Sequence, residues 1–390
     1  MKIKLEIIKK LFCVLCVTLF MCGTSFNVFA ESNIPEEEIK TMMEELVFPM
    51  TGVTGMVIGV ISGDDTFILG LGETVKDNGV KPNGQTVWQI GSASKVFTTN
   101  IFAAMVVEGK IKLTDPIRNY IPEDVKVPSY EGRQITLLDL ATHTSGFPRS
   151  IESEDLKSDL SGGYQKNPYY TAKEFYPWLN NYKLEVKPGT RYLYSNVGFA
   201  LLGDILARRE GITYGELVDK YIANRYGLKD TTVSPNKKQK MREAASYWMN
   251  GDLVQNDWVF KFEQPSGGIY STADDLTKFV RLNLGLIDEH YYPVTDIAHG
   301  VYVQRTELVN PYSFGLSGMA LGWEVDYSHN ALPVTFSKNG WVSGFNTWIF
   351  LVPSEKMGIF SISNKPCIFV DEELKNILRS TIGAKRKQSK

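Results

Sequence analysis

Two pairs of β-rich runs, one pair near each end of the chain, constrain the fold most strongly. Within each pair, four turn-forming residues separate the runs, which is typical of a β-hairpin. We therefore predict a single sheet that is built from both ends of the chain. The runs are residues 55–61 and 66–72 near the start, and residues 346–352 and 357–364 near the end.

Helical patterns fill the sequence between the hairpins and follow the second one. Residues 370–382 place apolar side chains on one helical face and end before Gly383, so we predict a helix that packs across the sheet. The chain shows no internal repeat and no low-complexity linker. We expect one compact unit with two lobes and a site in the cleft between them. The other predicted helices are residues 96–108, 136–141, 197–209, 214–226 and 272–284.

The first 30 residues have the pattern of a secretory signal peptide. Four lysines precede the apolar run 11–22, and Val28-Phe29-Ala30 resembles a cleavage site. The run is shorter than the ~20 residues that span a bilayer. An uncleaved membrane anchor is the main alternative, and a lipidated Cys22 is a weaker one. We expect residues 31–390 to form the mature domain, exported to the periplasm, the cell exterior or the cell envelope.

Charge and cysteine content exclude several classes of function. Removing residues 1–30 takes away four lysines and one glutamate, which changes the formal net charge from −2 to −5. No basic patch indicates nucleic-acid binding, although the short cationic tail at residues 385–390 allows peripheral association with the envelope as an alternative to a solvated terminus. Cys367 is the single cysteine after residue 30, so no intrachain disulfide, cysteine zinc site or C-x-x-C centre is possible there. The oligomeric state is left open by the sequence.

The tetrapeptide Ser92-Ala93-Ser94-Lys95 carries the first chemical signal. If residues 96–108 are helical, side chains three positions apart share a face, so the Lys95 amine lies beside the Ser92 hydroxyl. This pairs a nucleophile with a base that can activate it. Taken alone, a tetrapeptide of this kind is more often a solvated helix start.

Two further tripeptides follow in order. Tyr194-Ser195-Asn196 precedes the predicted helix 197–209, and Lys338-Asn339-Gly340 follows the apolar residues 334–337. Taken alone, the first is more often a packing tyrosine and the second a turn. Found together, in this order and at these separations, the tetrapeptide and the two tripeptides indicate a catalytic site far more specifically than any one of them alone.

The three motifs resemble the S-x-x-K, S-D-N and K-T-G boxes of the serine β-lactamase and penicillin-binding protein superfamily, in particular its class C branch. Within that branch the chain is most similar to AmpH-type D-alanyl-D-alanine carboxypeptidase/endopeptidases. The resemblance implies an α+β fold, with an antiparallel sheet flanked by helices, a mainly helical lobe, and the active site in the cleft between them. The segments that carry it are residues 113–116, 135–148, 267–272 and 346–364, with residues 72–89 and 127–149 for the narrower match.

The resemblance also implies three catalytic roles. Ser92 attacks the carbonyl carbon of a peptide or lactam. Lys95, with a pKa lowered by burial among cations, accepts the Ser92 proton. Tyr194 protonates the leaving nitrogen and then activates water, which requires nearby cations because a phenol ordinarily titrates near ~10.

Five further residues are implied in substrate binding. Asn196 orients the substrate amide, and Lys338 attracts the substrate carboxylate. The backbone N–H groups of Ser92 and Trp341 form the oxyanion hole, with Gly340 completing the third box. Asn339 stands where class C β-lactamases usually have threonine, which replaces a hydroxyl by an amide and weakens the β-lactamase interpretation more than the peptidase one.

Several functions remain open at this point. The expected partners are peptidoglycan stem peptides or β-lactams, and the leading hypothesis is a D-alanyl-D-alanine carboxypeptidase/endopeptidase. The alternatives are a class C-like β-lactamase that hydrolyses β-lactam antibiotics, a related esterase or D-amino-acid amidase, and a non-enzymatic β-lactam or cell-wall binding protein.

The histidines do not alter these hypotheses. We interpret His143 as a structural, hydrogen-bonded residue, because the three boxes already supply a base. His290, His299 and His329 lack the spacing of metal ligands, so we expect no metal and no cofactor.

Overall fold

The structure, a computed structural model, describes residues 32–151, 170–255, 259–309, 317–327, 332–367 and 369–388. The predicted signal peptide, His329, residues 389–390 of the cationic tail, and most of the loop between Ser145 and Tyr170 lie outside these residues. Cleavage after Ala30 therefore stays a prediction. The described residues from Asn33 onward cluster as one compact unit.

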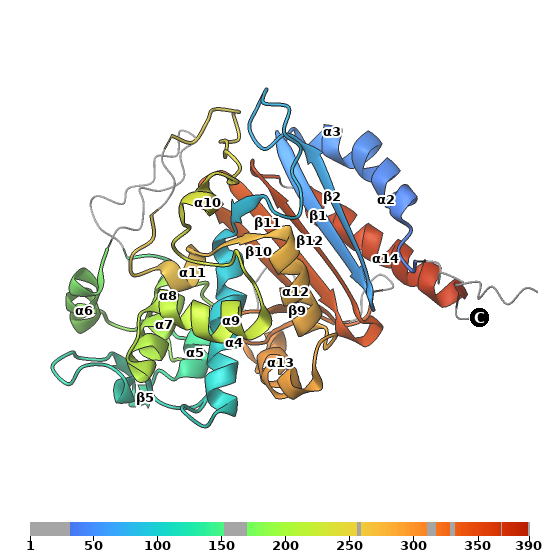
Figure 1. Ribbon diagram of the computed structural model, residues 1–390. Helices are drawn as coiled ribbons and strands as arrows, with labels where there is room; N and C mark the ends of the chain where they lie inside the picture. Colours follow the sequence, from blue (N-terminus) through green and yellow to red (C-terminus); the bar gives the residue numbers. More distant parts are fainter. Residues whose placement is uncertain are drawn as a thin grey trace, which may run out of the picture. The chain divides into compact units, whose positions relative to one another are not determined.

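Within the described residues, an eight-stranded sheet has the order β2-β1-β12-β11-β10-β9-β8-β7, and all its neighbouring strands are antiparallel (Figure 1). The first strand of the N-terminal hairpin pairs directly with the last strand of the C-terminal hairpin, with Met56 opposite Ser363. This pairing confirms the sheet predicted from both chain ends. The strands are β1 (Gly55–Ser62), β2 (Asp65–Gly72), β7 (Val303–Gln304), β8 (Gly318–Met319), β9 (Glu324–Asp326), β10 (Thr335–Val342), β11 (Phe345–Val352) and β12 (Met357–Ser363).

Strands β1 and β12 are buried along their whole length because helices cover the sheet from two sides, whereas the edge strand β2 is partly exposed. In β1, Met56 and Ile58 pack into the core beneath the terminal helices, whereas Val57 and Ile61 pack into the core of the helical lobe. This alternation follows from the two-residue period of a strand. It explains why the runs read as continuously apolar rather than as alternating.

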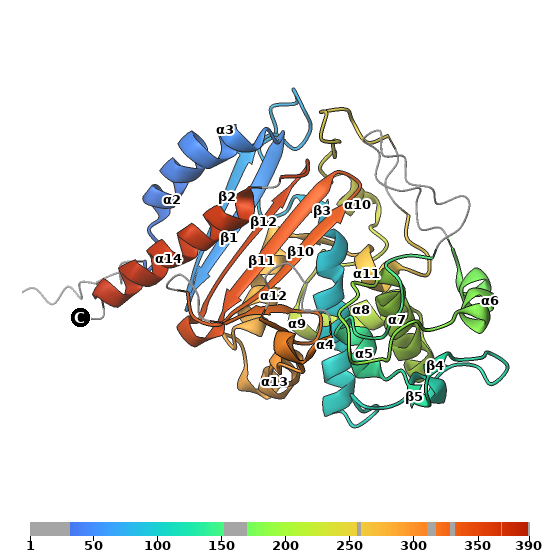
Figure 2. The same ribbon diagram turned by 180° about the vertical axis from the view of Figure 1, so that it is seen from behind.

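Figures 1 and 2 show α2 (Glu36–Met42), α3 (Phe48–Thr51) and α14 (Val370–Gln388) on one side of the sheet. The helices of the lobe lie on the other side, with α4 and α12 next to the sheet. Among the described helices, none is long and apolar enough to cross a membrane. The helices of the lobe are α4 (Ser94–Val107), α5 (Leu137–Ala141), α6 (Ala172–Asn181), α7 (Asn196–Glu210), α8 (Tyr214–Val218), α9 (Asn224–Tyr226), α10 (Lys237–Lys240), α11 (Gln264–Gly267), α12 (Ala273–Asn283) and α13 (Tyr292–His299). Two small sheets of two strands each accompany them. One pairs β3 (Val87–Gln89) with β6 (Tyr270–Thr272), and the other pairs β4 (Ser129–Tyr130) with β5 (Arg133–Gln134).

The predicted helices are present, but two of them differ in extent. The helix predicted to end before Gly383 continues to Gln388, because Gly383 lies in open space and the cations of the last turn favour a helix C-terminus. Lys385 also donates a hydrogen bond to the Glu355 carbonyl, which anchors the extra turn. The predicted helix 214–226 is interrupted by a π-helical turn at Asp219–Ala223.

Helix α4 runs through the middle of the helical lobe, and every residue from Ser94 to Met105 is buried. A helix that is enclosed all round has little freedom to shift. The turn that feeds it is therefore held rigidly, which matters because that turn carries Ser92.

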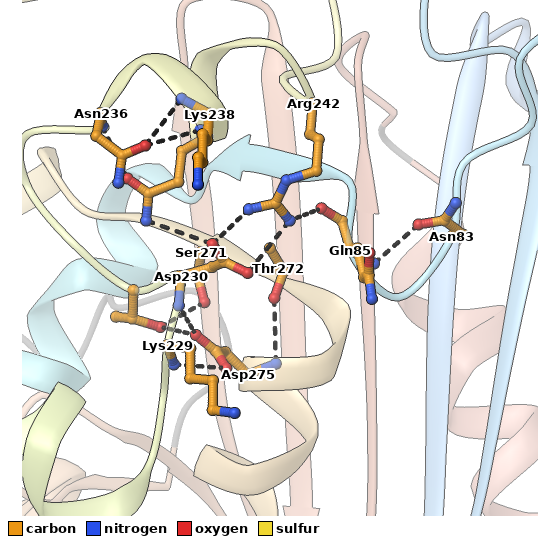
Figure 3. A network of polar contacts seen from close by, with 12 residues as sticks. Asn83, Gln85, Lys229, Asp230, Asn236, Lys238, Arg242, Ser271, Thr272 and Asp275 are labelled. Carbon is orange, nitrogen blue, oxygen red and sulfur yellow. Dashed lines mark hydrogen bonds and ion pairs between the residues drawn. The ribbon is translucent and has the colours of Figure 1, made fainter.

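A polar network fixes strand β3, which leads into the Ser92 turn (Figure 3). The backbone carbonyl of Arg242 accepts a hydrogen bond from the Val87 N–H, and its guanidinium binds the Gln85 carbonyl and the Asp230 carboxylate. Asp275 accepts the backbone N–H groups of Lys229 and Asp230 at 3.1 and 2.7 Å. The loop after α9 is thereby tied to both β3 and α12.

We expect Asp275→Ala to lower the free energy of unfolding by about 2–4 kcal/mol, because the part-buried N–H groups of Lys229 and Asp230 and the buried Thr231 hydroxyl lose their acceptor. The Asp275 side chain is 3% exposed, so its carboxylate oxygens are shielded from solvent in the folded protein. The matched control is Lys278→Gln, which removes a half-exposed ion-pair partner of Asp275 and is expected to cost under about 1 kcal/mol. Urea denaturation measures both variants, and equal losses would contradict this account.

Candidate active site

The first box forms a tight turn followed by the first turn of α4. Gly91 begins the turn with φ of +54°, a conformation that favours glycine, and Ser92 follows with its side chain partly exposed. Lys95 is fully buried, and its Nζ donates a hydrogen bond of 3.2 Å to the Ser92 Oγ. The spacing of three therefore places the two side chains together as predicted.

The second box lies at the start of α7. Ser195 caps this helix by accepting the Gly198 N–H, which sets the positions of the residues on either side. Tyr194 lies just before the cap, and its hydroxyl donates a hydrogen bond of 2.7 Å to the Ser92 Oγ. Asn196 is the first helical residue, and its Oδ1 accepts a hydrogen bond of 2.8 Å from the Lys95 Nζ.

The third box lies within β10, on the strand that precedes the terminal hairpin. A Cβ atom on Gly340 would lie 2.1 Å from the Ile90 carbonyl oxygen and 3.1 Å from the Ser92 nitrogen, so only glycine allows this approach. A Cβ atom on Gly91 would likewise lie 2.9 Å from the backbone of Trp341. The two backbone segments that carry the predicted oxyanion-hole donors are therefore in contact.

Lys338 lies on the same strand face as Gly340, with its side chain 1% exposed. Its Nζ is 3.3 Å from the Glu324 Oε1 and donates a hydrogen bond of 3.2 Å to the Asn339 Oδ1. Strand β9 supplies Glu324, which lies opposite Ser337 in the register with β10. The Lys338 ammonium thus has a carboxylate partner within the protein, which the sequence did not indicate.

The surroundings of Lys95 and Tyr194, the two groups beside Ser92, shift both of their pKa values to about 8. Burial lowers the pKa of Lys95 to about 8, with Lys338 and Arg149 adding to the effect. Burial alone would raise the pKa of Tyr194, but the Lys95 and Lys338 ammonium groups lower it to about 8. Near pH 8 either group can therefore be deprotonated and accept the Ser92 proton.

We expect the second-order rate of Ser92 acylation to rise with pH and to level off above about 8, because Lys95 or Tyr194 must be deprotonated first. Lysine ordinarily titrates near 10.5, so burial moves the midpoint downward. The measurement is the pH dependence of kcat/KM with an uncharged ester, which does not itself titrate. A flat profile between pH 6 and 9, or a midpoint near 10.5, would contradict the assignment.

His143 packs beneath the site and has a structural hydrogen bond. Its Nδ1 accepts the Ser195 N–H at 3.0 Å, and its ring stacks on Tyr194 with centroids 4.4 Å apart. Burial and the neighbouring Lys95, Lys338 and Arg149 charges hold the pKa of His143 well below its usual value. The ring is therefore neutral and supports the Tyr194 side chain from behind.

Three groups at the site were missed by sequence reasoning. The Ser266 carbonyl in α11 accepts a hydrogen bond of 2.6 Å from the Lys95 Nζ, and Glu324 pairs with Lys338. Arg149 places its guanidinium 5.1 Å from the centroid of the Tyr194 ring. A backbone carbonyl leaves no sequence signal, and neither Glu324 nor Arg149 belongs to a box. Arg149 does end the segment 127–149, which carries the resemblance to AmpH-type enzymes.

Comparison with known proteins identifies the family. The sequence profile described as Beta-lactamase matches residues 37–379. The chain belongs to the β-lactamase family. With the Ser92, Lys95 and Tyr194 side chains in mutual contact, this member of the β-lactamase family is a serine hydrolase.

Individual relatives agree with this assignment. The D-alanyl-D-alanine-carboxypeptidase/endopeptidase AmpH of Escherichia coli strain K12 is 30% identical over 354 residues, covering 88% of this chain and 89% of its own. A β-lactamase from Providencia stuartii is 25% identical over 378 residues, covering 90% and 91%. The crystal structure of a β-lactamase/D-alanine carboxypeptidase from Yersinia pestis complexed with citrate superposes with a TM-score of 0.76 at 28% identity, covering 89% of this chain and 97% of that one. The predicted α+β fold of this β-lactamase family member is thereby confirmed.

Proposed function

We propose that the protein is an exported D-alanyl-D-alanine carboxypeptidase/endopeptidase that cleaves peptidoglycan peptides through an acyl-enzyme on Ser92. The observation that carries the proposal is that the Ser92 Oγ lies 3.2 Å from the Lys95 Nζ and 2.7 Å from the Tyr194 hydroxyl. The similarity to AmpH along nearly the whole chain supports the choice of substrate.

The arrangement supports a two-step acyl transfer. Ser92 gives its proton to deprotonated Lys95 or Tyr194 as its Oγ bonds to the carbonyl carbon, while the oxyanion is held by backbone N–H groups. The carbon–nitrogen bond then breaks, and the leaving nitrogen takes a proton from Tyr194. Water next attacks the acyl carbon and loses its proton to the Tyr194 phenolate, and the Ser92 Oγ leaves with the proton that Lys95 or Tyr194 then holds, which restores the free enzyme.

Export forms part of the proposal because peptidoglycan lies outside the cytoplasm. The lysine-rich, apolar start of the chain supports it. The cationic residues at the end of α14 offer a route to peripheral association with the envelope. N-terminal sequencing of the protein from a cell-envelope or culture-supernatant fraction tests export, and a cytoplasmic protein beginning at Met1 would contradict it.

The test of activity supplies the purified protein with muropeptides and a chromogenic cephalosporin side by side, with Ser92→Ala as control. We expect release of D-alanine, or cleavage of cross-links, and slow cephalosporin turnover with a long-lived adduct. Fast cephalosporin hydrolysis without action on muropeptides would favour the second candidate, a class C-like β-lactamase. That candidate is supported by the similarity to the Providencia stuartii enzyme and weakened by Asn339 in the third box.

Two other hypotheses are separated by adding simple esters and amides to this assay. An esterase or D-amino-acid amidase would hydrolyse simple esters or amides and leave muropeptides intact, since one fold supports several acyl transfers. A non-enzymatic binding protein would turn over none of these compounds. The contact of Ser92 with both Lys95 and Tyr194 argues against a binding protein.

A further inference from the structure

Arg149 is an exposed cation beside Tyr194 that neither gives nor takes a proton in the proposed acyl-transfer steps. Its backbone carbonyl accepts the Asn196 N–H at 2.9 Å, which ties the residue to the second box. Its guanidinium carbon lies 5.1 Å from the centroid of the Tyr194 ring. The backbone is therefore fixed at the site, while the residue as a whole is exposed to solvent.

Within the described part of the chain no carboxylate forms an ion pair with Arg149, and the carboxyl group that interacts with it electrostatically, Glu263, is buried and accepts a hydrogen bond from the Tyr170 hydroxyl. Lys95 and Lys338 also lie near the same ring, at 4.9 and 5.5 Å from its centroid. Of these three cations, Lys338 is the one with a carboxylate partner, Glu324. The surroundings of Tyr194 thus carry excess positive charge, which attracts anionic ligands.

The geometry of the guanidinium suits a carboxylate ligand. A guanidinium that lies over an aromatic ring uses its face, and its N–H donors remain in the plane at its edge. Two of these donors can bind a carboxylate in a bidentate manner, which a lysine ammonium cannot reproduce. Lys338 is less available to such a ligand, because it is buried and already contacts Glu324 and Asn339.

We propose that Arg149 is a substrate-binding residue whose guanidinium binds the carboxylate of the peptide or lactam that acylates Ser92. This inference rests on the acyl transfer proposed above and names the anionic substrate class of the same site. It gives the enzyme a carboxylate-binding group outside the third box, where Asn339 departs from the usual threonine.

The experiment compares benzylpenicillin with its methyl ester, two acyl donors that differ by one carboxylate. Acylation rates are followed by intact-protein mass spectrometry for the wild type, Arg149→Gln and Arg149→Lys. We expect Arg149→Gln to slow acylation by the acid roughly 10- to 100-fold, the range for losing a hydrogen-bonded charge partner, and to slow the ester less than about threefold. Arg149→Lys should lie in between. The matched control is Lys387→Gln, which removes an exposed cation from α14 on the other side of the sheet and should change neither rate.

Two outcomes would overturn the proposal. Equal slowing of acid and ester would show that Arg149 acts on Tyr194 or on the fold, and unchanged rates would show that it does not bind substrate. Calorimetric binding of the acid and the ester to Ser92→Ala, with and without Arg149→Gln, gives the same comparison without chemistry. A protein that binds the acid through Arg149 but leaves muropeptides uncleaved would refute the proposed peptidase activity and leave this inference standing.

Discussion

Replacing Ser92 by alanine is expected to reduce hydrolysis of D-alanyl peptides by roughly 10⁴-fold or more, since the acyl-enzyme can no longer form. The fold should be retained, because Ser92 is partly exposed and its hydroxyl contacts only Lys95 and Tyr194 among the described residues. The measurement is release of D-alanine from a pentapeptide, together with the thermal midpoint of unfolding.

The same tetrapeptide contains a matched control. Ser94 is fully buried, and its Oγ accepts the Ile269 N–H at 3.0 Å. Ser94→Ala should therefore lower stability by about 1–3 kcal/mol while the folded protein still becomes acylated. If activity survives in Ser92→Ala but disappears in folded Ser94→Ala, the nucleophile is Ser94 and the account is contradicted.

Lys95→Met is expected to slow acylation of Ser92 by roughly 10²–10⁴-fold, the usual contribution of a general base. Methionine keeps most of the buried volume but removes the amine that contacts Ser92, Asn196 and the Ser266 carbonyl. It also removes a cation that lowers the pKa of Tyr194, so any residual acylation should move to higher pH. The measurement is the acylation rate with a penicillin between pH 6 and 10.

The matched control for this variant is Lys110→Met, which removes a lysine paired with Glu108 and Glu210 on the helical lobe. It should leave the pH profile unchanged. Acylation by Lys95→Met at more than a tenth of the wild-type rate with an unshifted profile would show that Lys95 is not the base.

The central elements of the fold were predictable because their patterns are local. Each hairpin shows two apolar runs around a turn, and a strand needs no distant information to be recognised. The sequence predicted that the two hairpins share one sheet, whereas the pairing of β1 with β12 became visible only in the folded chain. The outer strands β7, β8 and β9 are two or three residues long and have no periodicity to read, so their addition to the sheet was not foreseen.

The site was predictable to the extent that it resides in the three boxes. Ser92 and Lys95 are close in sequence, and so are Tyr194 and Asn196. The family resemblance predicted that these two pairs meet in one site. The partners that set their charge are distant in sequence and carry no motif. Glu324 reaches Lys338 through the β9–β10 register, and Arg149 reaches Tyr194 through a loop, so only the folded chain shows them.

The most direct test of the whole account is peptide mapping by mass spectrometry after the purified protein has reacted with a labelled penicillin. The account predicts a single adduct, with the mass of the opened lactam, on the peptide that contains Ser92, and its loss in Ser92→Ala. A wild-type protein without an adduct, or with the adduct on another residue, would contradict the claim that this enzyme works through an acyl-enzyme on Ser92.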